Sequence, residues 1–279
     1  QSNTIMSNLE ASYNLILNNL REISGIEDFY FKPIKPKLSD IELISLVILA
    51  EFKSIDSEHQ LFREIKGFEI GPNIERSVYN RRKRKLFPFI EEIRMKMVDK
   101  LNESENYFIV DSMPLEVCKI SRSFRSKICK DVDYAYPNKG FCASQNLHFY
   151  GYKLHAVCSI SSVFQSFDIS PASVHDIHYL QDIKLQMSDC VLLGDKGYLS
   201  QTIQLDLFKE VNIELETPKR KNQKDYKPQF YQFKKYRKRI ETLFSQLCDQ
   251  FMIRRNYAKT FEGFKTRILA KITTLTTIQ

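Results

Sequence analysis

Three acidic residues have the types and positions that could carry metal-dependent chemistry. Asp111 and Asp195 each follow a short apolar run, Tyr107–Val110 and Val191–Leu193, which is typical of a buried strand. Adjacent strands lie about 4.8 Å apart, so carboxylates at the ends of two neighbouring strands could share a cation. Glu241 lies at the edge of the apolar stripe of an expected helix, from which its carboxylate could reach the rim of the same sheet.

Carboxylates grouped in this way suit one class of reaction. Their charges repel unless a cation neutralises them, and hard oxygen ligands select Mg²⁺ or Mn²⁺. Two such ions about 4 Å apart can activate an attacking oxygen and stabilise a leaving oxygen at phosphorus. Each residue alone leaves a plainer interpretation open, because a strand-end aspartate often caps a turn and a glutamate beside an apolar stripe often faces solvent.

Basic residues gather in three parts of the chain, whose net charge is +8. The segment from Lys219 to Arg239 holds ten Lys or Arg and one acid, Asp225, and a second cluster runs from Arg81 to Lys85. The third cluster consists of Lys119, Arg122, Arg125, Lys127 and Lys130. A basic run is often only a solvated face, but three of them favour a polyanionic partner such as nucleic acid.

The elements that must position these residues fall into two groups, the first of which is helical. Residues 9–101 are expected to form short helices, including Asp40–Phe52 with Ser39 or Asp40 as its N-cap and a helix over Ser57–Ile65. A helix carrying the second basic cluster is expected after Gly71-Pro72. This pattern resembles a helix-turn-helix module, although any small helical bundle would produce it too.

From Tyr107 onward the pattern changes to strands, and the expected fold class is α/β. Gly151–Ile160 and Val163–Ile169 alternate as a hairpin around Ser161-Ser162, and Ile213–Thr217 is a further short strand. The expected strands are Tyr107–Val110, Gly151–Ile160, Val163–Ile169, Val191–Leu193 and Ile213–Thr217. The expected helices in this part are Val174–Met187, Gln229–Ile253 and Phe261–Ile278.

Five blocks of residues 105–279, taken in order, resemble DDE-type bacterial insertion-sequence transposases, closest to the insertion sequence 982 family. These blocks are Ile109-Val110-Asp111-Ser112, Gly151-Tyr152-Lys153-Leu154-His155, Gly194-Asp195-Lys196-Gly197-Tyr198, Thr217-Pro218 and Arg239-Ile240-Glu241-Thr242-Leu243-Phe244. The resemblance implies a ribonuclease H-like mixed-sheet catalytic domain over residues 105–279, preceded by a small all-helical DNA-binding domain over residues 1–104.

The resemblance also implies an activity. Asp111, Asp195 and Glu241 match the family's catalytic acids, which hold two Mg²⁺ or Mn²⁺ ions. The expected reaction is cleavage of the 3′ ends at the terminal inverted repeats of an insertion sequence, followed by joining of these ends to target DNA. The expected partner is therefore double-stranded DNA. A homodimer on DNA is expected because two ends must be held together.

Neighbouring branches of the family carry Tyr, Arg, Glu and Lys at fixed spacing around the last acid. Here Arg237 lies four residues before Glu241 as in that pattern, whereas Lys234 and Cys248 occupy the Tyr and Lys positions. Lys196 directly follows the second aspartate and suits a phosphate contact, or else a solvated position. The expected DNA contacts are Arg81, Arg82, Lys83, Arg84, Lys85, Lys196, Lys219, Arg220, Lys234, Arg237, Lys238, Arg254 and Arg255.

Other candidates have plainer interpretations. His175-Asp176 fits a helix cap better than a metal ligand, and His148 and His155 on a strand fit packing or a DNA contact better than general-base catalysis. Two alternative functions stay open. One is a metal-dependent nuclease of the same fold that does not join DNA, and the other is a non-catalytic DNA-binding protein descended from a transposase.

Two further classes are excluded by composition. The longest nearly unbroken apolar stretch, Leu43–Ala50, is far shorter than the roughly 20 residues of a membrane helix, and no signal-peptide pattern is seen, so a cytoplasmic protein is expected. The six cysteines are scattered without a C-x-x-C pair. This spacing argues against a zinc site and a disulfide framework and favours reduced packing residues.

Overall fold

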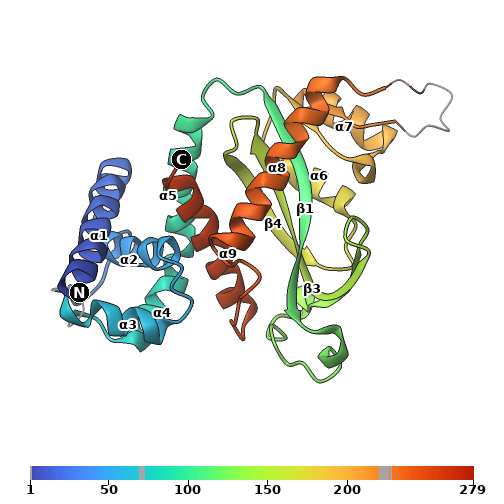
Figure 1. Cartoon of the computed structure of the whole chain (residues 1–279). Helices are drawn as coiled ribbons and strands as arrows, with labels where there is room; N and C mark the ends of the chain where they lie inside the picture. The colour runs from blue at the N-terminus through green and yellow to red at the C-terminus, as the bar shows by residue number, and fades with distance from the viewer. Residues whose placement is uncertain (1, 69–72, 220–225, 227) are drawn as a thin grey trace. The chain divides into compact units, whose positions relative to one another are not determined.

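The computed structural model describes residues 2–68, 73–219, 226 and 228–279, and two compact units can be distinguished in it (Figure 1). The helical unit comprises Gln1–Asp99, Asp249–Asn256 and Glu262–Gln279. The sheet unit comprises Lys100–Cys248 and Tyr257–Phe261. The C-terminal helix, expected in a continuous second domain, thus belongs to the helical unit, while the functional division at residues 104 and 105 stays a prediction.

A mixed sheet forms the sheet unit. Its strands are β1 (Tyr107–Cys118), β2 (Asn138–Cys142), β3 (Leu147–Ser159), β4 (Phe164–Pro171), β5 (Cys190–Leu193) and β6 (Ile213–Glu216). The strand order is β2-β3-β1-β5-β6, and β4 also pairs with β3. Strand β3 is antiparallel to β1, β2 and β4. Strand β5 is parallel to β1 and to β6. This central β1 flanked by an antiparallel and a parallel half confirms the ribonuclease H-like α/β fold.

The register of β1 differs from the expectation that the strand ends at Asp111. Its parallel ladder with β5 does stop at the pair Ile109↔Leu193. Its antiparallel ladder with β3 continues from Asp111↔Ala156 to Cys118↔Tyr150. The strand therefore runs seven residues beyond the acid, because β3 supplies hydrogen-bonding partners where β5 no longer does.

The two faces of the sheet have different covers. Helices α6 (Tyr179–Ile183) and α7 (Gln201–Val211) contribute to an apolar core that includes Phe108, Val110 and Leu192. Helix α8 (Tyr231–Asp249) covers the other face, on which the Tyr107 ring lies 6.2 Å from Phe233 and 6.1 Å from Tyr236 (Figure 1). The predicted apolar stripe of α8 is confirmed for Ile240, Leu243, Phe244 and Leu247, which are all buried. Phe251, its fifth expected member, is buried too but lies beyond the end of α8.

Two expected helices are shorter in the structure. The segment Val174–Met187 contains only the 3-10 turn η5 (Asp176–His178) and α6, and α8 ends at Asp249 and not at Ile253. Residues 119–146 and strand β2 within them had no expected structure.

All six cysteines are free, and Cys129, Cys158 and Cys190 are buried. Within the described ranges, no helix combines the length and apolar character needed to cross a membrane.

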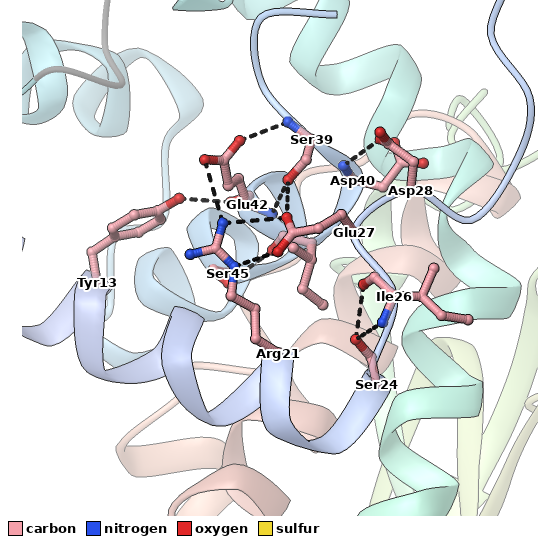
Figure 2. A network of polar contacts seen from close by, with 11 residues as sticks. Tyr13, Arg21, Ser24, Ile26, Glu27, Asp28, Ser39, Asp40, Glu42 and Ser45 are labelled. Carbon is pink, nitrogen blue, oxygen red and sulfur yellow. Dashed lines mark hydrogen bonds and ion pairs between the residues drawn. The ribbon is translucent and has the colours of Figure 1, made fainter. Parts of the chain in front are cut away.

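The helical unit is built around α2, whose bounds match the prediction. It contains α1 (Ser2–Ser24), α2 (Asp40–Phe52), α3 (Glu58–Glu64), the 3-10 turn η1 (Ile65–Gly67), α4 (Arg76–Lys85), α5 (Phe87–Leu101) and most of α9 (Phe261–Thr277). Ser39 caps α2 in a capping box with Glu42, as Figure 2 shows. The expected start of the third helix after Gly71-Pro72 lies outside the described residues.

Candidate active site

Asp111 and Asp195 lie close enough to interact electrostatically. Asp111 lies within β1, two residues beyond the last β1–β5 pair, Ile109↔Leu193, and Asp195 lies two residues beyond that pair in the turn that follows β5. The pKa of Asp111 is raised to about 7, mainly by burial and in addition by the charge of Asp195, while a hydrogen bond from the Ser112 amide opposes the rise. The two carboxylates therefore act on each other electrostatically.

Asp195 is held by the turn that follows β5. Its carboxylate caps the 3-10 turn η6 (Lys196–Tyr198), where Oδ1 accepts a hydrogen bond of 2.7 Å from the Gly197 amide. A Cβ atom on Gly197 would lie 2.9 Å from this oxygen, which is too close for an ordinary contact. Gly197 thus belongs to a tight turn around Asp195, and the capping role of this carboxylate coexists with its position near Asp111.

Helix α8 brings a cation toward the acids. Arg237 is half-buried, and its positive charge lowers the pKa of Asp111. Glu241 lies one helical turn further on the same side of α8 and is exposed. In the part of the chain that the structure describes, no group of three or more His, Cys, Asp or Glu side chains could hold a metal ion. The structure therefore brings Asp111 and Asp195 together but does not add Glu241 to them.

Asp176 is a further acid at this site, which sequence reasoning had interpreted as part of a helix cap. Lys153 Nζ donates hydrogen bonds of 2.9 Å to Asp176 Oδ1 and to the Val174 carbonyl. The charge of Asp176 also raises the pKa of Asp111. His175, in the N-cap position of η5, makes no side-chain capping bond. The available signal was that Lys153 lies in one of the five family-like blocks.

His155 is a packing residue beside this ion pair. It is 1% exposed, its Nε2 lies 2.7 Å from Ser170 Oγ, and its ring stacks on Tyr179 with centroids 5.3 Å apart. Burial lowers its pKa to about 4, while the charge of Asp176 opposes this shift. The ring is therefore neutral at pH 7, which agrees with the packing interpretation. His148, by contrast, is exposed.

The oxygen atoms around Asp111 suit a divalent cation only in part. The Tyr198 hydroxyl is buried and has no hydrogen-bond partner among the described residues. Burial raises the pKa of Tyr198, and the charges of Asp176, Asp111 and Asp195 add to this effect. An orphaned polar atom close to three carboxylates marks a place where charge is not balanced by the protein alone. Asp111 and Asp195 fit a cation, whereas a third carboxylate ligand is not in place.

A comparison with known families shows the family of this chain. The family model described as "Transposase DDE domain" matches residues 103–277, which is more than half of the chain. The chain belongs to the transposase DDE domain family. The match spans Asp111, Asp195 and Glu241 and leaves the helices before residue 103 outside.

Other comparisons of this DDE domain add little. A solved structure titled "Mos1 transposase paired-end complex with left transposon end" is similar over 85% of this chain and 85% of that chain, at 12% identity and a TM-score of 0.24. A likeness at this TM-score carries no argument about the site. No curated protein matches the chain.

The basic cluster of α4 in this DDE transposase is only partly available to DNA. Arg82 is buried, and its guanidinium donates a hydrogen bond of 2.8 Å to the buried carboxylate of Asp40. Lys83 pairs with Glu58 at 2.7 Å, and Arg84 donates to Asn80 Oδ1 at 2.7 Å. The expectation that all five residues contact DNA is not supported for these three, because their charges already bind partners within the helical unit.

Most of the remaining candidate DNA contacts are exposed. The exposed members are Arg81, Lys85, Lys196, Lys219, Lys234, Lys238, Arg254 and Arg255. Arg220 lies outside the described residues. Arg254 and Arg255 belong to the helical unit, whereas the acids belong to the sheet unit.

Proposed function

We propose that this protein is an active transposase of the insertion sequence 982 family, which cleaves the 3′ ends of its element and joins them to target DNA. The observation that supports the proposal is the proximity of Asp111 and Asp195, each two residues beyond the last β1–β5 pair. The pKa of Asp111, raised by burial and by the charge of Asp195, is that expected for an acid at a cation site. The family membership supports the same reaction class.

The proposed metal ligands are Asp111, Asp195 and Glu241. Two Mg²⁺ or Mn²⁺ ions held there would polarise the attacking and leaving oxygens of the scissile phosphodiester. The Gly197 amide orients the Asp195 carboxylate. Arg237 faces the region of Asp111 and would bind a phosphate of the substrate. Lys196 would bind a second phosphate from its exposed position after Asp195.

DNA is the proposed partner. The exposed basic residues supply phosphate contacts, and residues 1–104 are proposed to recognise the terminal inverted repeats of double-stranded DNA. Arg82, Lys83 and Arg84 are left out of this set because they pair within the protein. A homodimer on DNA is proposed because the joining reaction needs both ends at one place.

The test is cleavage and joining of labelled DNA that carries the ends of its own element, with Mg²⁺ or Mn²⁺. We expect metal-dependent products in the wild type and their loss in Asp111→Ala, Asp195→Ala and Glu241→Ala. Asp182→Ala is the matched control, since Asp182 is an exposed acid of the sheet unit. DNA binding retained in all four variants, together with activity in Asp182→Ala alone, supports the proposal. Activity retained in any of the three acid variants contradicts it.

One observation favours a second candidate. Because no three-residue metal group occurs among the described residues, the chain could bind DNA without chemistry. DNA binding without any product from the wild type, under either metal, would favour this candidate. Products from uncut ends but no joined product from pre-cut ends would instead identify a nuclease that lacks strand transfer.

A further inference from the structure

The segment between β1 and β3 forms a lobe that the proposed reaction does not use. This basic lobe, residues 119–146, contains the 3-10 turns η3 (Ile120–Arg122) and η4 (Asp133–Ala135) and strand β2. Figure 1 shows it in green, beyond the ends of β1 and β3. It begins directly after β1, whose last residue, Cys118, lies seven residues beyond Asp111, or about 24 Å at the usual rise per residue.

The lobe is held to the rest of the sheet unit by several contacts. The Cys129 amide donates to the Lys259 carbonyl at 2.8 Å, and the Tyr152 hydroxyl donates to the Ala135 carbonyl at 2.7 Å. The Asp131 carboxylate accepts a hydrogen bond of 2.9 Å from the Phe261 amide. These contacts come from separate parts of the lobe. Its surface residues are therefore presented on a fixed scaffold.

The charge of the lobe is mostly unbalanced. Its basic residues are all exposed, and in the described chain none of them forms an ion pair. They are Lys119, Arg122, Arg125, Lys127, Lys130 and Lys139. The lobe's two acids make other contacts, since Asp131 holds the Phe261 amide and Asp133 hydrogen-bonds the Tyr136 hydroxyl. The surface is suited to a polyanion.

The basic lobe also carries exposed aromatic rings. Phe124 is 75% exposed and Tyr134 is 83% exposed, while Phe141 is also exposed. The Arg125 guanidinium lies over the Phe124 ring, 4.9 Å from its centroid. Exposed rings beside cations on a fixed scaffold are the pattern of surfaces that stack bases and hold the phosphates between them. A duplex hides the faces of its bases, so these rings would find stacking partners only in unpaired nucleotides.

We propose that the basic lobe binds unpaired nucleotides of DNA. Its Lys and Arg side chains contact the phosphates, and Phe124 and Tyr134 stack on bases. The inference rests on the proposed function, because cleavage and joining of DNA are what would produce unpaired nucleotides near the cut. What it adds is a single-strand site made of residues other than the acids and the exposed basic residues of α4.

The test measures binding of a labelled single-stranded oligonucleotide and of the same sequence as a duplex, in EDTA, by fluorescence anisotropy. We expect the double variant Phe124→Ala/Tyr134→Ala to weaken single-strand binding by about tenfold or more and duplex binding by less than about twofold. The matched control, Leu185→Ala/Phe208→Ala, removes two exposed apolar side chains elsewhere in the sheet unit and leaves both affinities unchanged.

Three results would overturn the proposal. In the first, the Phe124→Ala/Tyr134→Ala variant binds the single strand as tightly as the wild type. In the second, this variant loses as much affinity for the duplex as for the single strand. In the third, polyglutamate competes for the lobe as tightly as the single-stranded oligonucleotide binds. Thermal melting of each variant checks that the fold is intact. Because the assay contains no metal, Asp111→Ala keeps single-strand binding if the lobe is the site. The two proposals are tested separately. A protein without cleavage activity could still bind single-stranded DNA through the lobe, and an active transposase could lack this binding.

Discussion

At the scale of single residues, the unusual group is Asp111. It lies on the central strand β1, and its pKa of about 7 reflects burial first, to which the charge of Asp195 adds and which the hydrogen bond from the Ser112 amide opposes. Such a group costs the fold free energy when it is ionised without a counter-ion. This conflict between stability and charge is typical of a functional position.

The pH dependence of stability follows from this residue. An unfolded aspartate titrates near 3.8, and folded Asp111 titrates near 7. Between these values the folded state retains a proton that the unfolded state has released, so the free energy of unfolding falls as pH rises through this window. Asp111→Asn stays neutral and lacks this fall.

Without metal, we therefore expect Asp111→Asn to be more stable than the wild type above pH 7, by on the order of 3 kcal/mol, and nearly equal near pH 4. Urea unfolding at pH 4, 6 and 8 measures the difference. Asp182→Asn serves as the control, since that side chain is exposed. A difference that is the same at pH 4 and pH 8 would show that Asp111 titrates normally.

At the scale of elements, the site depends on how strands and turns end. The β1–β5 ladder stops at Ile109↔Leu193, so both acids leave the ladder at the same level. The turn after β5 then folds Asp195 back onto its own backbone through Gly197. Helix α8 adds Arg237 by packing its apolar stripe on the face that carries Asp111.

Gly197→Ala tests the contribution of this turn. The new Cβ would meet Asp195 Oδ1 at 2.9 Å, so the carboxylate must move away from its present position. We expect cleavage to fall by about tenfold or more, since small displacements of a catalytic group cost up to ~100-fold. Stability should change by less than about 1 kcal/mol, because the residue is exposed.

The control for this turn is Gln201→Ala, an exposed change at the start of α7. Cleavage rates on labelled ends and thermal melting measure both effects. Wild-type cleavage by Gly197→Ala would indicate that the position of Asp195 in this turn does not matter to the reaction.

At the scale of the whole molecule, the C-terminal helix belongs to the same compact unit as the N-terminal helices. Helix α9 follows the sheet unit in sequence but belongs to the helical unit. There Lys271 and Glu51 form a buried ion pair between α9 and α2. A second contact joins Arg267 to the Asp56 carbonyl at 3.0 Å. The helical unit is therefore incomplete without residues that come from the other end of the sequence.

The buried pair predicts a specific mutational pattern. Lys271→Met leaves the Glu51 carboxylate buried without its cation, and we expect a loss of about 3–5 kcal/mol. The double variant Glu51→Leu/Lys271→Met removes both charges and should recover most of that loss. Chemical unfolding of the single and double variants measures the recovery. If the double variant loses the sum of the two single effects, the pair is not coupled.

Local patterns in the sequence determined much of this protein. The apolar runs before Asp111 and Asp195, the N-cap of α2 and the stripe of α8 depend on residues close together in the chain, and each has the predicted structure. The fold class could therefore be identified without coordinates, whereas the role of the three acids stays a prediction. Segments with mixed patterns, such as Val174–Met187, could not be assigned well, because tertiary contacts break their helix.

Only the tertiary structure decided which charged side chains are exposed and which are paired within the protein. Arg82 and Arg81 are neighbours in one basic run, yet Arg82 is buried against Asp40 and Arg81 is exposed. Asp176 and Lys153 are far apart in the sequence and meet beside Asp111. A charge has the same appearance in a sequence whether it faces solvent or a partner. Burial and pairing arise from contacts between distant residues, so they depend on the folded structure.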